Sequence, residues 1–139
     1  VFAALKPGGR FVGEMGGAGN VATLRAGIRA ELEARGYPVD AGDSIWCPAP
    51  EVFSAIYAAA GFVDIEARLI DRPTPLPAGA AGWYTTFRAG FMDTSGVPED
   101  EQAAVAKAAE ARVAASLRQP DGRWIADYVR LRFTMRKPL

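Results

Sequence analysis

The sequence contains no histidine and a single cysteine, Cys47, among its 139 residues. Without histidine there is no histidine-based catalytic triad and none of the usual zinc ligand sets, and one thiol cannot form a disulfide within the chain. Because Cys47 has no imidazole to activate it, we expect a small buried residue and not a nucleophile. An unpaired thiol fits a reducing compartment, so the cytoplasm is the expected location.

The chain also lacks an excess of charge, because sixteen Lys and Arg residues balance sixteen Asp and Glu residues. Such a chain has no basic field to attract nucleic acid or an anionic membrane, and we expect neither partner. No apolar run approaches the ~20 residues that span a bilayer. Half the residues are hydrophobic and 23% are charged, which indicates a folded chain. Its length allows one domain at most.

Turn residues and hydrophobic periodicity predict three strands and several helices. The strands are expected near 10–15, 63–71 and 124–136. The helices are expected at 21–35, 51–60, 83–91 and 98–117. The last two strands alternate apolar and polar side chains, as strands with one buried face do. Val1–Leu5 is typical of the end of an apolar helix, and three prolines in 72–77 predict an extended connector outside any sheet.

A glycine-rich segment, 16–20, separates the first expected strand from the first long helix. Gly17, Gly19 and Ala22 satisfy a relaxed dinucleotide-binding spacing. Such a site also needs an acidic residue at the end of a second strand ~20 residues on, whereas 37–43 contains acidic residues but no strand. The alternatives for the segment 16–20 are a flexible turn and a turn that borders a substrate pocket.

The order of these signals resembles the C-terminal part of the class I S-adenosylmethionine-dependent methyltransferases. Residues 5–12, LKPGGRFV, are similar to the segment that leads into the fifth strand of that fold. Residues 50–53 and 59–63 resemble its helix and sixth strand, and 124–133 resembles its seventh, antiparallel strand. The segment 72–76 and the helical insertion that follows look most like the trans-aconitate methyltransferase group. The resemblance spans nearly the whole chain.

The resemblance implies an α/β, Rossmann-like fold whose C-terminal part is a mixed three-stranded sheet with helices and a helical insertion at 72–122. In this family loops after the first four strands hold most of the methyl donor, S-adenosylmethionine, and none of those segments precedes Val1. We therefore expect residues 1–139 to be the C-terminal portion of one methyltransferase domain without its donor-binding half. This portion is expected to be inactive by itself, with no cofactor-binding residue and no metal ligand.

The same resemblance places the loop after the fifth strand beside the methyl acceptor. The expected acceptor-binding residues are Glu14, Gly16, Gly17, Asn20, Trp46, Arg72 and Trp83. Aromatic rings supply rigid pocket walls, although they are more often core residues, and an arginine can hold a carboxylate through a bidentate fork, although surface arginines are more often solvated. Methyl transfer from a sulfonium depends on positioning more than on acid–base groups. The resemblance thus implies O-methylation of a small carboxylate-like acceptor.

The alternative is a stand-alone interaction domain whose three-stranded sheet pairs with another chain. An exposed sheet edge or apolar face predicts a homodimer under either interpretation. A row of basic residues near the C-terminus is expected to cover a helix with its aliphatic stems, with phosphate binding as the other possibility. This row consists of Arg130, Arg132, Arg136 and Lys137.

Overall fold

The computed structural model describes residues 1–39 and 45–139, which belong to two compact units. The first unit consists of Val1–Asn20, Trp46–Arg72 and Tyr128–Leu139. The second consists of Val21–Ile45 and Pro73–Asp127. The two acidic residues that a dinucleotide site in 37–43 would use, at positions 40 and 43, lie outside the described residues.

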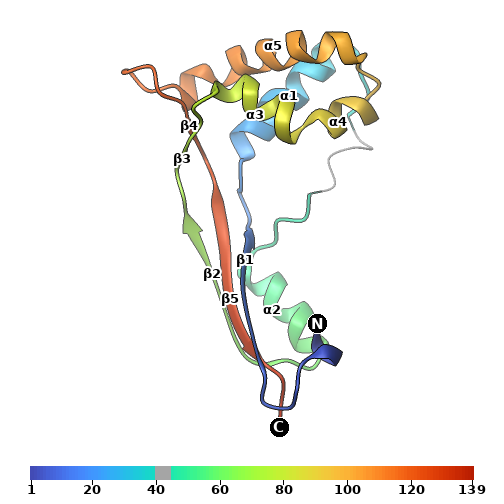
Figure 1. Ribbon diagram of the computed structural model, residues 1–139, viewed down its shortest axis with the longest axis vertical. Helices are drawn as coiled ribbons and strands as arrows, with labels where there is room; N and C mark the ends of the chain where they lie inside the picture. Colours follow the sequence, from blue (N-terminus) through green and yellow to red (C-terminus); the bar gives the residue numbers. More distant parts are fainter. Residues whose placement is uncertain (40–44) are drawn as a thin grey trace. The chain divides into compact units, whose positions relative to one another are not determined.

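The first unit is built on a three-stranded antiparallel sheet (Figure 1). Its strands, in spatial order, are β1 (Arg10–Gly16), β5 (Val129–Arg136) and β2 (Val63–Asp71). β5 lies between the other two and runs antiparallel to both. The α/β class and the first two strand positions are confirmed. The expected antiparallel direction of the last strand is also confirmed. The expected mixed sheet is wrong, because β5 separates β1 from β2 and leaves no parallel pair in the part of the chain that the structure describes.

The side chains of β5 alternate between a buried face and an open face. Leu131, Phe133 and Met135 are buried, whereas Arg132 and Arg136 are exposed. This period of two follows from the pleat of a strand, which points successive side chains to opposite faces. The predicted alternation is confirmed, and it gives the sheet one apolar face and one arginine-rich face.

Helix α2 (Pro50–Ala59) packs on the apolar face and has Phe53 at its centre, with none of that side chain exposed. The ring centroids of Phe53 and Phe133 lie 4.7 Å apart. Gly13 of β1 leaves room for the Phe133 ring, because a Cβ at Gly13 would lie 2.6 Å from Phe133 Cζ. The core of the first unit therefore depends on aromatic stacking over a glycine.

The segment at the start of the chain is a short 3₁₀ helix, η1 (Phe2–Ala4), where the end of an apolar helix was expected. Phe2 packs edge-on against Phe62, with 5.0 Å between ring centroids. Lys137 Nζ donates hydrogen bonds to the carbonyl oxygens of Phe2 and Leu5. The two ends of the described chain are thus tied together within the first unit.

Strand β2 follows the predicted alternation only in part. Ile65 and Ala67 pack against the core, but Val63 and Leu69 are 43% and 40% exposed. The register with β5 shifts between Val63 and Glu66, a bulge in which Asp64 has a positive φ of 50°. An extra residue in a strand turns the side chains beside it away from their expected face, which accounts for Val63, whereas Leu69 lies beyond the bulge and directly opposite Leu131. Periodicity counted in the sequence cannot foresee such a shift.

The last expected strand, 124–136, is divided into two strands that belong to different units. β4 (Ile125–Ala126) pairs with β3 (Thr74–Pro75) in the second unit, and β5 begins after Asp127 and Tyr128. The prediction that 72–77 lies outside any sheet is therefore wrong at Thr74–Pro75. A proline is compatible with so short a ladder, because the backbone N–H that it lacks is not required where that position faces away from the partner strand.

Four helices make up most of the second unit as far as its residues are described. They are α1 (Ala22–Ala34), α3 (Gly79–Phe87), α4 (Ala89–Thr94) and α5 (Glu99–Leu117). The single helix expected at 83–91 is instead two, separated at Arg88, whose φ of −123° and ψ of 9° are not helical. None of the helices in the described ranges has both the length and the hydropathy needed to cross a bilayer.

Helices α1, α3 and α5 meet at a point where α1 has a glycine. Tyr84 Oη, fully buried on α3, donates a hydrogen bond of 2.9 Å to the carbonyl oxygen of Leu24 on α1. A Cβ at Gly27 would lie 2.4 Å from Val113 Cγ1 on α5 and 2.8 Å from Tyr84 Oη. Only a residue without a side chain allows the three helices to approach this closely.

Gly27→Ala should lower the free energy of unfolding by about 1–3 kcal/mol, because the new methyl group overpacks the contact of α1 with Val113 and Tyr84. Gly90→Ala is the matched control, since no atom lies within 4 Å of a Cβ there. It should raise the free energy by about 0.4–1 kcal/mol, because alanine restricts the unfolded chain. Urea unfolding followed by circular dichroism measures both. Equal effects of the two substitutions would contradict the close approach.

Candidate functional site

Glu14 lies on the open face of the sheet in the first unit and is surrounded by three arginines. Its Oε1 accepts hydrogen bonds from Arg72 Nη1 at 2.6 Å and from Arg130 Nε at 3.3 Å. Its Oε2 accepts from Arg132 Nη2 at 2.8 Å and from Arg132 Nε at 3.1 Å. These four residues are called the Glu14 cluster below.

The register of the sheet places the Glu14 cluster. Glu14 of β1 is directly opposite Arg132 of β5, and Arg130 lies two residues further along the same face. The bonds from Gly17 N to Val129 O and from Lys137 N to Gly9 O make the odd-numbered positions of β1 the hydrogen-bonded ones. Glu14 therefore occupies a non-hydrogen-bonded position, where opposed side chains are closest. Arg72 follows the end of β2, so the cluster lies where β1 and β2 end and β5 begins.

The electrostatics of the Glu14 cluster favour anions. The hydrogen bond from Arg132 is the largest influence on the pKa of Glu14 and lowers it, and together with Arg130 and Arg72 it outweighs the opposing effect of burial. Glu14 is thus ionised at neutral pH and holds the guanidinium groups in place. One carboxylate among three guanidinium groups leaves an excess of positive charge, and the Arg72 side chain is 63% exposed. A further carboxylate or phosphate could be bound there through a charge-assisted fork.

The glycine turn after β1 is packed against its own chain. A Cβ at Gly16 would lie 2.8 Å from Asn20 Nδ2 and 3.0 Å from Cys47 Sγ, and one at Gly17 would lie 2.3 Å from Leu69 Cδ2. Asn20 is buried, and its Oδ1 accepts a 3.0 Å hydrogen bond from the backbone N–H of Val129. Gly16, Gly17 and Asn20 therefore fix the turn against β5, and Asn20 is held by the backbone. Cys47, expected to be buried, is half-buried beside this turn.

The residues at the glycine turn and at the start of α1 do not fit a nucleotide or the methyl donor. Protein side chains fill the space beside Gly16 and Gly17, so a ligand phosphate cannot approach the backbone at these two residues. At the start of α1, Asp127 Oδ2 accepts a 2.8 Å hydrogen bond from Thr23 N, and Asp127 O accepts one of 2.9 Å from Val21 N. The position that an anion takes at a helix N-terminus is thus filled by a carboxylate of the chain itself.

The two tryptophans differ in their surroundings. Trp46 is 49% exposed and stacks on Phe53 of the first unit, with 6.3 Å between ring centroids. Trp83 is 8% exposed in the second unit and packs against Tyr84 and Phe87. The structure thus brings Glu14 and Arg72 into contact and places Gly16, Gly17 and Asn20 in the adjoining turn. Trp46 is an open ring on the same unit, and Trp83 is a core residue of the other.

Two members of the Glu14 cluster were not among the expected acceptor residues. Arg130 and Arg132 were expected to cover a helix, together with Arg136 and Lys137. That expectation is wrong, because α2 packs on the opposite face of the sheet and Lys137 binds backbone carbonyls near the N-terminus. The alternation of 129–136 does place these arginines on one face, but only the pairing of β5 with β1 reveals Glu14 opposite them.

Comparison with protein-family models and with curated proteins finds no match for this chain.

Glu14→Gln should lower stability at neutral pH and remove part of its pH dependence. Because the pKa of Glu14 in the folded protein lies below its ordinary value of 4.5, the ionised cluster stabilises the fold above that value. This stabilisation is lost as the pH falls through the folded pKa, where the carboxylate is protonated. The difference in unfolding midpoint between wild type and Glu14→Gln should therefore be largest above about pH 5 and shrink at lower pH.

The control is Glu51→Gln, which removes an exposed carboxylate of the first unit that has no ion pair within residues 1–39 and 45–139. It should produce a smaller difference at neutral pH. The measurement is the urea unfolding midpoint of the wild type and both variants between neutral and acid pH. A Glu14→Gln effect that persists unchanged at about pH 2 would show that packing, and not charge, is responsible.

Proposed function

We propose that this chain is the C-terminal part of an S-adenosylmethionine-dependent methyltransferase domain that acts on a small carboxylate-like acceptor. The order and directions of the strands are the observation that carries the proposal. Strands β1 and β2 run in the same direction, and the last strand is inserted between them antiparallel to both. The resemblance implies a last strand that is antiparallel to the others, and β5 is antiparallel to both of its neighbours. The Rossmann-like fold and the activity are parts of this proposal.

The Glu14 cluster is the proposed binding site for the acceptor carboxylate. Arg72 is the most exposed of its three arginines and is the best placed to form a bidentate contact, with Arg130 supplying additional charge. Glu14 is a positioning residue, because it orients the guanidinium groups and limits their mutual repulsion. When bound, S-adenosylmethionine supplies a methyl group already activated by a positively charged sulfur. The described residues would then need only to bind and orient the acceptor, because a carboxylate is ionised at neutral pH without a base.

Arg72→Gln should raise the KM for a carboxylate acceptor roughly 10–100-fold and change kcat less, because a charge-assisted hydrogen bond made in the ground state is lost. The assay uses the polypeptide encoded by the complete reading frame that contains residues 1–139, labelled methyl donor and a panel of small carboxylic acids. A methyl ester is identified by the methanol it releases in alkali.

The matched control is Arg118→Gln, which removes the same charge at an exposed arginine after α5 in the second unit. It should leave KM unchanged. Methyl transfer to no acid in the panel would contradict the carboxylate acceptor. Binding of the donor to residues 1–139 alone, measured by calorimetry, would contradict the proposal that the donor is held elsewhere.

The open edge of β1 favours a second candidate function, an interaction domain that pairs with its own copy. Since the odd-numbered residues of β1 bond to β5, the backbone N–H and C=O groups of Arg10, Val12 and Glu14 point away from it. No strand within residues 1–39 and 45–139 pairs with that edge. Val12 is 59% exposed, and β1 contains neither the proline nor the bulge that commonly protects an edge.

The sequence of β1 is complementary to itself in one antiparallel register. With Val12 opposite Val12 of a second copy, each Arg10 faces a Glu14, and each Phe11 faces a Gly13. Shifting this register by two residues toward the strand end would bring Val12 opposite Glu14 and lose both charge pairs. The second copy is therefore the occupant that the edge chemistry favours.

Val12→Lys should convert a dimer of residues 1–139 to a monomer, because two lysines would meet at the centre of the paired edges. Val63→Lys, at an exposed valine of the other edge strand, should leave the dimer intact. Sedimentation equilibrium measures the mass. Val12→Cys should also form an interchain disulfide when Arg10→Cys does not. A wild-type monomer, or cross-linking of both cysteine variants alike, would exclude this dimer.

A further inference from the structure

The open face of the sheet contains two pairs of arginines directly opposite each other on neighbouring strands. Arg10 of β1 is opposite Arg136 of β5, and Arg68 of β2 is opposite Arg132 of β5. Like charges in directly opposed positions destabilise a sheet. Arg132 is compensated by Glu14, whereas the other three have no carboxylate partner within residues 1–39 and 45–139. The fold thus retains repulsive pairs that its own acidic residues do not neutralise.

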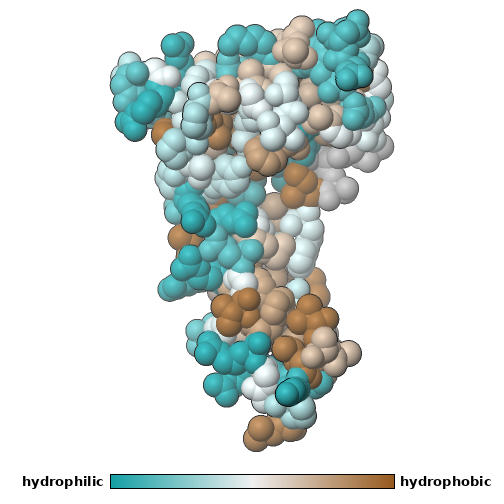
Figure 2. All heavy atoms as spheres, in the orientation of Figure 1, coloured by the Kyte–Doolittle hydropathy of each residue, from teal (hydrophilic) through white to brown (hydrophobic). Residues whose placement is uncertain are grey.

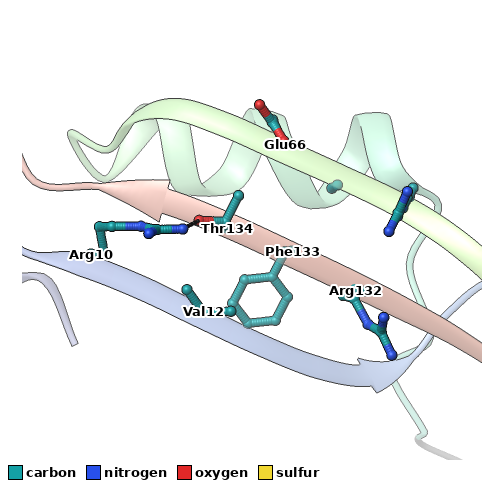
Figure 3. A pocket seen from close by; sticks show the side chains of 8 residues that line it. Arg10, Val12, Glu66, Arg132, Phe133 and Thr134 are labelled. Carbon is teal, nitrogen blue, oxygen red and sulfur yellow. Dashed lines mark hydrogen bonds between the residues drawn. The ribbon is translucent and has the colours of Figure 1, made fainter.

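Three of these arginines, Arg10, Arg68 and Arg132, border a hollow on the sheet. Its volume is about 340 Å³, and its lining includes Arg10, Val12, Glu66, Arg68, Arg132 and Thr134. Figure 3 shows Arg10 extending from β1 toward Thr134 on β5, and the Arg10 Nη2 donates a 3.3 Å hydrogen bond to Thr134 Oγ1. Arg132 lies further along the same hollow, and α2 is behind the sheet (Figure 3). Figure 2 shows hydrophilic residues gathered over the strands beside the hydrophobic ones around α2.

The groups around the hollow match an anion with more than one charged group. Arg10 and Arg68 come from the two edge strands and Arg132 from the strand between them, so all three strands contribute an arginine to the lining of the hollow. Glu66 is opposite Thr134 and supplies one carboxylate, which leaves an excess of positive charge. Thr134 adds a hydroxyl that can donate or accept, and the exposed Val12 provides an apolar surface between the charges. A single chloride would neutralise one arginine and leave the others opposed.

We propose that this hollow binds a small anion that carries two or more phosphate or carboxylate groups. The ligand bridges Arg10 and Arg68 across β5 and neutralises the repulsion that each experiences from β5. The site shares Arg132 with the Glu14 cluster but differs from the position proposed for the methyl acceptor, because it is centred on Arg10 and Arg68 and not on Arg72 and Arg130. It depends on neither the methyl donor nor a second copy.

The test uses residues 1–139 and two probes, pyrophosphate and a tricarboxylate, each compared with sodium chloride at the same ionic strength. Isothermal calorimetry gives affinity, and thermal unfolding gives the shift in midpoint. If the site binds phosphates and carboxylates alike, both probes should raise the unfolding midpoint beyond the chloride control. A response to pyrophosphate alone would assign the site to phosphates, and a response to the tricarboxylate alone would assign it to carboxylates.

Arg68→Gln distinguishes anion binding at this site from nonspecific binding to positive charge. It should weaken probe binding by tenfold or more, and it should raise the unfolding midpoint when no probe is present, because it removes the repulsion with Arg132. Arg10→Gln should weaken binding likewise, while Arg118→Gln, with the same loss of charge, should do neither. Unchanged affinity in Arg68→Gln and Arg10→Gln, or no response to either probe beyond chloride, would overturn the proposal. Methyl transfer plays no part in these measurements, so they fail or succeed independently of the proposed enzyme.

Discussion

The insertion of β5 between β1 and β2 is the constraint on which the first unit depends. One face of β5 supplies Leu131, Phe133 and Met135 to the core, and the other supplies arginines to the open face. Because the side-chain period of a strand is two, these roles cannot be separated, and a one-residue slip would bury the arginines and expose the core. The pairing that orders the core therefore also assembles the Glu14 cluster.

The positions of most elements could be predicted from the sequence, because they depend on local signals. Prolines and glycines mark the ends of α2 and α5, and the alternation in 129–136 marks β5. What failed depends on partners that are distant in the chain. The place of β5 between β1 and β2, the pairing of Thr74–Pro75 and the bulge near Asp64 are set by strand pairing and register, which no local pattern encodes.

The candidate site could be predicted only in part, through the family resemblance that placed the loop after the first strand beside the acceptor. Glu14 and Arg72 were selected in this way, and they are in contact. Arg130 and Arg132 were assigned to the wrong neighbour, since a basic row has the same sequence pattern whether it covers a helix or faces a carboxylate. Asn20 was expected to bind the acceptor, but its side chain accepts a hydrogen bond from the backbone N–H of Val129. This bond satisfies a backbone donor beside the turn, which is a structural role that the sequence did not indicate.

The balanced net charge illustrates why a total is a poor guide to a surface. Sixteen charges of each sign cancel over the whole sequence, and that balance argued against nucleic acid and anionic membranes as partners. The sheet nevertheless places Arg10, Arg68 and Arg136 on one face without a carboxylate partner in the described residues. Charged groups within a Debye length of about 8–10 Å respond to their neighbours and not to the total. A neutral chain can therefore hold a strongly cationic face, and the affinity of that face for multivalent anions is set by strand register.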